Sequence, residues 1–243
     1  MRFASAFLCF CLTLGTAFAA PTEGVVFIKN AGKSSEIFYN EKPVNIKRNA
    51  TLPAAGLRVK VAKDGTFSAV FSNGVAIFAS DGADFSVETL KHLSGKNLSE
   101  NFDMKISVAS GKLYFSIPKN PLNGKILIEL PNCSVSTNCP RLAVFADSDG
   151  AKIAPFEGIA RVKRGDGVWN VVASENYAKI PTDKSKKIDF GKIYKVEVEQ
   201  IGELFKYADT AAKQTVFSRN ANGGLAGQFA VSKSFLTMPT KHK

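Results

Sequence analysis

The feature that most constrains the fold is a long series of short segments rich in β-branched and aromatic residues, separated by Gly, Asn, Asp and Pro. The series runs from Gly24 to Val198, with a strand and a turn about every ten residues. No amphipathic helical pattern interrupts it. We therefore expect residues 20–199 to form one all-β domain, with short strands in a solenoid-like, roll-like or sandwich arrangement.

Local signals divide this region into strands. Residues 57–61 alternate apolar and basic side chains, which buries one face and leaves the other in water. Asn73-Gly74 joins two β-rich runs and suits the positive φ angles of a two-residue hairpin. Asp81-Gly82 and Ser110-Gly111 are likewise predicted to be turns. The alternating segment Lys192–Glu199 is predicted to be the last strand.

The C-terminal part has a different pattern. Apolar residues recur at helical spacing from Ile201 to Ala208, which predicts a short helix in the segment 200–217. A polar, Gly-rich stretch follows, so residues 218–243 are expected to form a flexible tail. An edge strand at Gln228–Val231 is the alternative for one part of this tail.

The N-terminal residues 1–19 have the organisation of a secretory signal. Arg2 precedes an apolar stretch that ends in Ala17-Phe18-Ala19, the small-residue pattern at which signal peptidase cleaves. The stretch is shorter than the ~20 residues needed to span a bilayer, and no basic flank follows it. We expect cleavage after Ala19 and export to the periplasm or beyond, with no transmembrane segment in the mature chain.

Cys133 and Cys139 are the cysteines that remain after such a cleavage, and they flank a polar, turn-forming stretch. In an oxidising compartment, two cysteines this close in the chain usually pair, so we predict a disulfide. The alternatives are a metal pair and a redox pair. A metal site would lack a second pair of ligands, and a redox pair would have C-x-x-C spacing.

Two stretches resemble a known family. Leu57–Leu90 contains a strand, an Asp-Gly turn, a Phe-rich strand, Ser-Asn-Gly and a short apolar strand, and it ends in Phe-Ser-Val-Glu before Thr89. Ile106–Pro131 contains Ile-Ser-Val-Ala-Ser-Gly-Lys-Leu-Tyr-Phe-Ser-Ile-Pro-Lys and later Ile-Glu-Leu-Pro. This order resembles the FecR-like domain of bacterial envelope signal transducers and stand-alone exported proteins. The resemblance implies an all-β domain of short strands that wind as a solenoid or roll.

The chain also departs from that family. The family usually continues with Arg-Gly-Thr and an apolar strand, whereas the nearest alignment here gives Asn138-Cys139-Pro140 before Arg141. Signal-transducing members carry an anti-sigma region and a membrane helix ahead of the domain, where this chain has the predicted signal. The resemblance therefore implies the exported module and not the transducing role.

The residues give little support for catalysis. The chain has two histidines, His92 and His242, and no Gly-x-Ser-x-Gly motif that would present a nucleophile. Asp147 and Asp149 resemble the start of a calcium loop, but the later carboxylate is missing, so a turn is the favoured interpretation. We expect no enzyme activity, no metal and no cofactor.

The charge indicates the nature of a partner. The chain has 32 Lys and Arg against 21 Asp and Glu, a net charge of +11, which attracts anionic partners. Nucleic acid is not expected, because the aromatic residues lie mostly in predicted strands and serve core packing. The basic residues form either a solvated face or a binding surface. The candidate residues of this surface are Arg161, Lys163, Arg164, Lys184, Lys186, Lys187 and Trp169.

Three functional classes follow. The favoured one is a non-catalytic envelope module that presents sheet edges and a basic surface to an envelope protein or an anionic envelope polymer. The alternative is a carbohydrate- or cell-wall-binding module, which would place Trp169, Tyr177 and Tyr194 on one exposed face. A hydrolase would need a cleft that brings His92 near a serine or a carboxylate.

Overall fold

The computed structural model of the chain describes residues 22–32, 34–46, 48–93, 98–99, 101–119, 124–219 and 225–229. The predicted signal peptide and residues 230–243 of the predicted tail lie outside these ranges. The first strands are β1 (Thr22–Glu23), β2 (Val25–Ala31), β3 (Ser35–Tyr39), β4 (Lys42–Val44), β5 (Ala50–Pro53), β6 (Leu57–Val61), β7 (Thr66–Phe71), β8 (Ala76–His92) and β9 (Phe102–Ser116).

The remaining elements follow in the second half of the chain. They are β10 (Lys125–Leu130), β11 (Cys133–Thr137), β12 (Arg141–Asp147), β13 (Gly150–Glu157), β14 (Ile159–Lys163), β15 (Asn170–Ala173), β16 (Asn176–Pro181), β17 (Asp189–Lys192), α1 (Lys195–Lys213), β18 (Thr215–Arg219) and β19 (Leu225–Phe229). The expected all-β class with one short C-terminal helix is confirmed.

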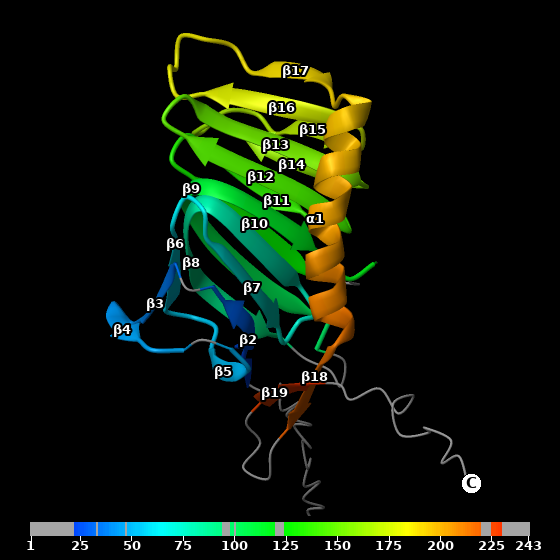
Figure 1. Cartoon of the computed structure of the whole chain (residues 1–243). Helices are drawn as coiled ribbons and strands as arrows, with labels where there is room; N and C mark the ends of the chain where they lie inside the picture. Colours follow the sequence, from blue (N-terminus) through cyan, green and yellow to red (C-terminus); the bar gives the residue numbers. More distant parts are fainter. Residues whose placement is uncertain are drawn as a thin grey trace, which may run out of the picture.

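The large sheet is folded on itself into two layers. The covered layer, whose outer face carries α1, contains β5, β2, β7, the first half of β8, the second half of β9, β12, β13, β16 and β17. The open layer contains β4, β3, β6, the second half of β8, the first half of β9, β10, β11, β14 and β15. From β10 onward, successive hairpins alternate between the layers, which gives the stacked arrangement visible in Figure 1.

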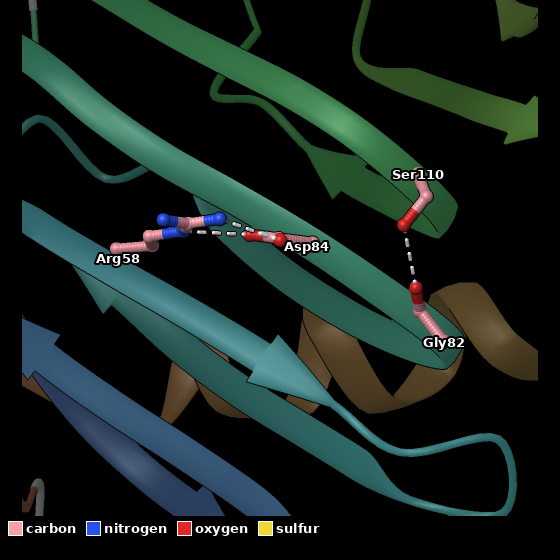
Figure 2. A network of polar contacts seen from close by, with 4 residues as sticks. All are labelled: Arg58, Gly82, Asp84 and Ser110. Carbon is pink, nitrogen blue, oxygen red and sulfur yellow. Dashed lines mark hydrogen bonds and ion pairs between the residues drawn. The ribbon is translucent and has the colours of Figure 1, made fainter.

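The long β8–β9 hairpin passes from one layer to the other through a kink. Asp81 and Gly82 have φ angles of 49° and 73°, and Gly111 on the facing strand has φ of 89°. A Cβ atom at Gly111 would overlap the backbone of Ala83, so only glycine allows the strands to approach this closely. The Ser110 hydroxyl donates to the Gly82 carbonyl at 2.9 Å across the kink (Figure 2). The predicted turns at Asp81-Gly82 and Ser110-Gly111 are thus bends within two continuous strands.

The predicted hairpin at Asn73-Gly74 is confirmed, with a three-residue loop instead of two. The Phe71 amide bonds the Val75 carbonyl at 2.8 Å, and the Gly74 amide bonds the Phe71 carbonyl at 2.8 Å. Gly74 has a φ of 83°, the left-handed position that such loops require.

The main core lies between the two layers. Alternate residues of each strand point into it, for example Ile106 and Val135 of the open layer and Phe115 and Val144 of the covered layer. Burial of this apolar surface is the main force that holds the layers together. Outward-facing residues of the open layer are polar or partly exposed over most of its strands.

Helix α1 packs on the outer face of the covered layer (Figure 1). The Phe205 ring lies edge-on to the rings of Tyr114 (5.9 Å between centroids) and Phe156 (5.2 Å). The helix begins at Lys195, so the predicted strand Lys192–Glu199 is wrong. Alternating apolar and charged residues fit a strand only if one face is buried, whereas Val196 is 63% exposed.

The chain beyond α1 forms a β18–β19 hairpin that packs against β2 and β5. Thr51 Oγ1 donates to the Gly227 carbonyl at 3.2 Å, and the Gly227 amide donates back to Thr51 Oγ1 at 3.1 Å. Residues 218–219 and 225–229 of the expected tail therefore lie in strands β18 and β19. The edge strand considered at Gln228–Val231 corresponds to β19, which begins three residues earlier, at Leu225.

Candidate functional site

The outer face of β14 and β15, at one end of the open layer, carries an exposed group of apolar and basic side chains. The register pairs Ile159 with Ala173 and Arg161 with Val171. Because side chains alternate along a strand, these residues point outward while their neighbours fill the core. Ile159 is 52% exposed and Val171 is 61% exposed. We call Ile159, Arg161, Lys163, Trp169 and Val171 the β14–β15 surface.

Lys163 and Trp169 lie together at one end of this surface. The Lys163 ammonium is 5.3 Å from the centroid of the Trp169 ring, within the range of a cation–π interaction. Trp169 precedes β15 and remains 40% exposed. The pair presents a flat aromatic ring and a positive charge at the same place, a combination that is common at protein interfaces.

Arg164 is bonded to backbone carbonyls of a neighbouring loop. Its Nη1 atom donates to the Lys186 carbonyl at 2.6 Å, and its Nη2 atom donates to the Pro181 carbonyl at 3.1 Å. The guanidinium thus fastens the loop between β16 and β17 to the end of β14, and its Nε atom is buried without a hydrogen-bond partner within the described chain. Arg164 is half-buried, and its hydrogen bonds hold this loop in place.

The fastened loop carries the other predicted basic residues. Lys184, Lys186 and Lys187 are all exposed on it. In the same loop the Asp183 carboxylate accepts hydrogen bonds from the Ser185 hydroxyl (2.7 Å) and amide (2.9 Å), which hold the pKa of Asp183 below its usual value. The structure therefore brings the sequence-predicted basic residues and Trp169 to one end of the molecule.

Strand β15 forms an edge of the sheet, because its register is with β14 alone among the strands that the structure describes, and both sides of β16 are taken by β13 and β17. The Ser174 amide bonds the Gly158 carbonyl at 2.9 Å. Since backbone groups alternate in direction along a strand, Val172 bonds toward β14, whereas Val171 and Ala173 direct their N–H and C=O groups away from the sheet. Sequence reasoning identified the charges here and expected exposed sheet edges, but it did not show that β15 is such an edge.

The predicted disulfide is not formed. Cys133 and Cys139 are both free and buried. Cys133 starts β11 and Cys139 lies beyond its end, and a strand rises about 3.3 Å per residue. The two thiols are therefore at opposite ends of an extended segment, farther apart than the ~7 Å between Cα atoms that a disulfide allows. The polar stretch between them was interpreted as a turn, but its alternation is that of a half-buried strand.

Burial changes the chemistry of both thiols. It raises the pKa of Cys133 to about 12 and that of Cys139 to about 11, although a hydrogen bond from the Thr137 hydroxyl to Cys139 Sγ (3.0 Å) partly opposes the second shift. Protonated, buried thiols are poor nucleophiles and poor metal ligands.

His92 does lie beside a serine, but inside the protein. Its Nε2 atom is 2.8 Å from Ser72 Oγ, and its Nδ1 atom is 3.0 Å from the Leu98 carbonyl. Because a carbonyl only accepts, Nδ1 donates to Leu98, and in the neutral imidazole Nε2 then accepts from Ser72. Ser72 Oγ also accepts from the Val25 amide at 3.1 Å. Both side chains are at most 5% exposed, so this arrangement ties β1–β2, the β7–β8 loop and the end of β8 together.

Asp147 and Asp149, which were considered as the start of a calcium loop, form a turn. The Asp147 carboxylate accepts from the amides of Asp149 (2.8 Å) and Gly150 (3.0 Å), the predicted turn. Among the described residues, no group of three or more His, Cys, Asp or Glu side chains could hold a metal ion.

No helix within the described ranges is long and apolar enough to cross a membrane.

The three aromatic residues considered for sugar binding do not share a face. Trp169 lies on the open layer. Tyr177 lies on the outer face of the covered layer, under the Lys152 ammonium at 4.7 Å. Tyr194 is at the start of α1. They therefore do not form the common platform that a polysaccharide would need.

Known proteins resemble this chain only distantly. No protein-family model and no curated protein matches the sequence. Two crystal structures of a "putative anti-sigma factor" from Parabacteroides distasonis are similar to the chain, each with a TM-score of 0.40. Their sequence identities are 9% and 8%, and each match covers 68% of this chain and 80% of the other. At these values the similarity assigns no family.

Proposed function

We propose that the chain is an exported, non-catalytic, FecR-like module of the bacterial envelope that binds a protein partner through the β14–β15 surface. The observation that carries the proposal is the coincidence of exposed apolar side chains, a cation–π pair and an open strand edge at one place. Exposed apolar groups with an Arg or Trp at their centre are typical of interfaces.

The FecR-like part of the proposal rests on the sequence patterns in Leu57–Leu90 and Ile106–Pro131. Export rests on the signal-like residues 1–19. The non-catalytic part is supported by His92, the histidine of the described chain, being buried in a fully bonded network away from solvent.

A protein partner fits this surface better than a polysaccharide. Ile159 and Val171 are aliphatic, and they lie beside a single exposed aromatic ring, Trp169. Sugar-binding platforms stack several rings along one face, whereas aliphatic and aromatic groups with a basic rim are usual at protein interfaces.

The test is site-specific photo-crosslinking in a cell-envelope extract of the organism that encodes the chain. A photoreactive phenylalanine derivative replaces Trp169 in one variant and Tyr207 in a matched control. Tyr207 is an exposed aromatic residue on α1, on the opposite side of the molecule.

The proposal predicts one or a few discrete, protease-sensitive adducts with the photoreactive group at position 169 and none of these at 207. Arg161→Glu combined with Lys163→Glu should weaken them severalfold. Identical adducts at both positions, or none at 169, would contradict it. An adduct that resists protease but disappears with glycosidases would favour the carbohydrate alternative.

A further inference from the structure

We infer that the partner is an extended, acidic polypeptide segment that adds to the sheet as a new strand alongside β15. This inference rests on the proposed function, since it specifies how the β14–β15 surface recognises a protein. In strand addition, backbone hydrogen bonds at a sheet edge supply affinity, and the side chains of alternate residues supply specificity.

The first argument is that β15 lacks the protection of the other edges. Within the described part of the large sheet, and apart from the two-residue β1, the strands that pair on one side only are β4, β5, β15 and β17. Natural proteins block such edges with charges, proline or a covering segment. In the described chain, β4 carries Lys42 and Pro43, β17 carries Asp189 and Lys192, and β5 is bonded to β19 through Thr51.

Strand β15 has none of these devices. Its sequence is Asn-Val-Val-Ala, without charge, proline or glycine. Val171 and Ala173 are exposed, and no hydrogen bond to their outward N–H and C=O groups is found within the described residues. A flat, apolar, unpaired edge of this kind readily accepts another strand.

The second argument is charge. Arg161 and Lys163 lie one strand inward from the edge, and the loop fastened by Arg164 adds Lys184, Lys186 and Lys187. The acidic residues of the same region are Asp166, Asp183, Asp189 and Glu175. Asp183 is engaged by Ser185, and Glu175 follows the far end of β15. Near Trp169, the five basic side chains outnumber Asp166, Asp183 and Asp189, so this end of the edge favours acidic side chains on the incoming strand.

Backbone geometry defines a sharp test. Proline at 171 removes an N–H that points away from the sheet, so the pairing with β14 is kept while an incoming strand loses a donor. Val171→Ala is the matched control, because it removes apolar surface but keeps the N–H. Circular dichroism and urea unfolding check that both variants remain folded.

The probe is a short capped peptide in which Glu alternates with Val, with a Lys-for-Glu version as its charge control. Two further versions carry backbone N-methyl groups, one on every Glu and one on every Val. An added strand presents only one of these two sets of N–H groups to β15, so one N-methylated peptide should lose binding and the other should keep it.

The inference predicts that the Glu peptide binds at least about tenfold more tightly than the Lys peptide at low salt. One N-methylated version and Val171→Pro should each weaken binding about tenfold or more, whereas Val171→Ala should weaken it about threefold or less. If Val171→Pro does not fold, the two N-methylated peptides decide the matter on the unaltered protein.

Equal binding of the two N-methylated peptides would overturn strand addition, as would preference for the Lys peptide. Neither result would contradict the proposed function, because the photo-crosslinking at position 169 tests the proposed function separately. If protein partners crosslink at position 169 but the two N-methylated peptides bind equally well, strand addition is wrong and side chains alone recognise the partner.

Discussion

Gly111 and Gly82 face each other across the kink of the long hairpin, and both have positive φ angles. They differ in the space around them. A Cβ at Gly111 would overlap Ala83, whereas a Cβ at Gly82 would meet nothing within 4 Å. Gly111→Ala should therefore lower the free energy of unfolding by about 3 kcal/mol or more, and Gly82→Ala by only about 1 kcal/mol. Urea unfolding measures both, and equal losses would contradict the described kink.

The state of the cysteines is a second prediction at this scale. With Ala20 as the first residue, the unfolded mature chain should show two reactive thiols with a chromogenic disulfide reagent. The folded chain should react slowly at neutral pH, because Cys133 and Cys139 are buried and protonated. A denatured sample without reactive thiols would mean that the disulfide forms after all.

The raised pKa values of the thiols also predict a pH dependence. A thiol whose pKa is about 8.5 when unfolded and about 11 to 12 when folded stabilises the fold fully below pH ~8.5 and loses this contribution as the pH rises further. Unfolding at about pH 10 should therefore need about 2 kcal/mol less per thiol than at neutral pH. In a Cys133→Ala, Cys139→Ala double variant this part of the decrease should disappear. If the free energy of unfolding of this double variant falls as much between neutral pH and pH ~10 as that of the wild type, the two thiols are not the cause of the decrease.

Residue-level prediction from the sequence was uneven for identifiable reasons. The basic residues and Trp169 could be found because charge and aromatic character are visible in the sequence, and the fold brings them together. The disulfide was wrong because spacing along the chain says nothing about distance when the intervening residues are extended. The role of Arg164 could not be predicted, because its carbonyl partners lie far along the chain, at Pro181 and Lys186.

At the scale of elements, α1 covers the outer face of the covered layer. Phe205 is 1% exposed between Tyr114 and Phe156, whereas Tyr207 is largely exposed two residues later. Phe205→Ala should reduce the free energy of unfolding by about 3–5 kcal/mol, and the control Tyr207→Ala by about 1 kcal/mol. Chemical denaturation measures both variants. If both lose a similarly small free energy of unfolding, the helix is not packed on the sheet as described.

The strands themselves indicate which face α1 covers. Residues 76–79 and 142–145 are apolar without alternation, which is typical of strands buried on both faces. The strands of the open layer alternate, as in Lys125–Leu130. This contrast was available from the sequence. The start of the helix was not, because Lys195–Glu199 alternates as a strand would, and only packing shows that neither face is buried there.

At the scale of the whole molecule, the alternation of hairpins between two layers leaves an edge at each end of each layer. At one end, β4 carries Lys42 and Pro43, and the β18–β19 hairpin covers β5 (Figure 1). At the other end, β17 carries the charged residues Asp189 and Lys192. The remaining edge, β15, coincides with the basic and aromatic side chains of the β14–β15 surface. This coincidence is the reason that we propose binding at that end of the molecule.

Export makes a whole-molecule prediction. When the full chain is expressed in a bacterium with its own N-terminus, intact-mass measurement should find a mature protein that starts at Ala20. Ala19→Arg should block this cleavage because the peptidase site accepts small residues. A wild-type protein that keeps residues 1–19 would contradict the predicted signal.

The most direct test of the open edge is amide hydrogen exchange resolved by residue. In the free protein, Val171 and Ala173 should exchange rapidly and Val172 slowly, because only Val172 bonds toward β14. Saturation with the alternating Glu peptide should slow exchange at Val171 and Ala173. Protection of these two amides in the free protein, or no change on saturation, would contradict an edge that is open and receives a strand.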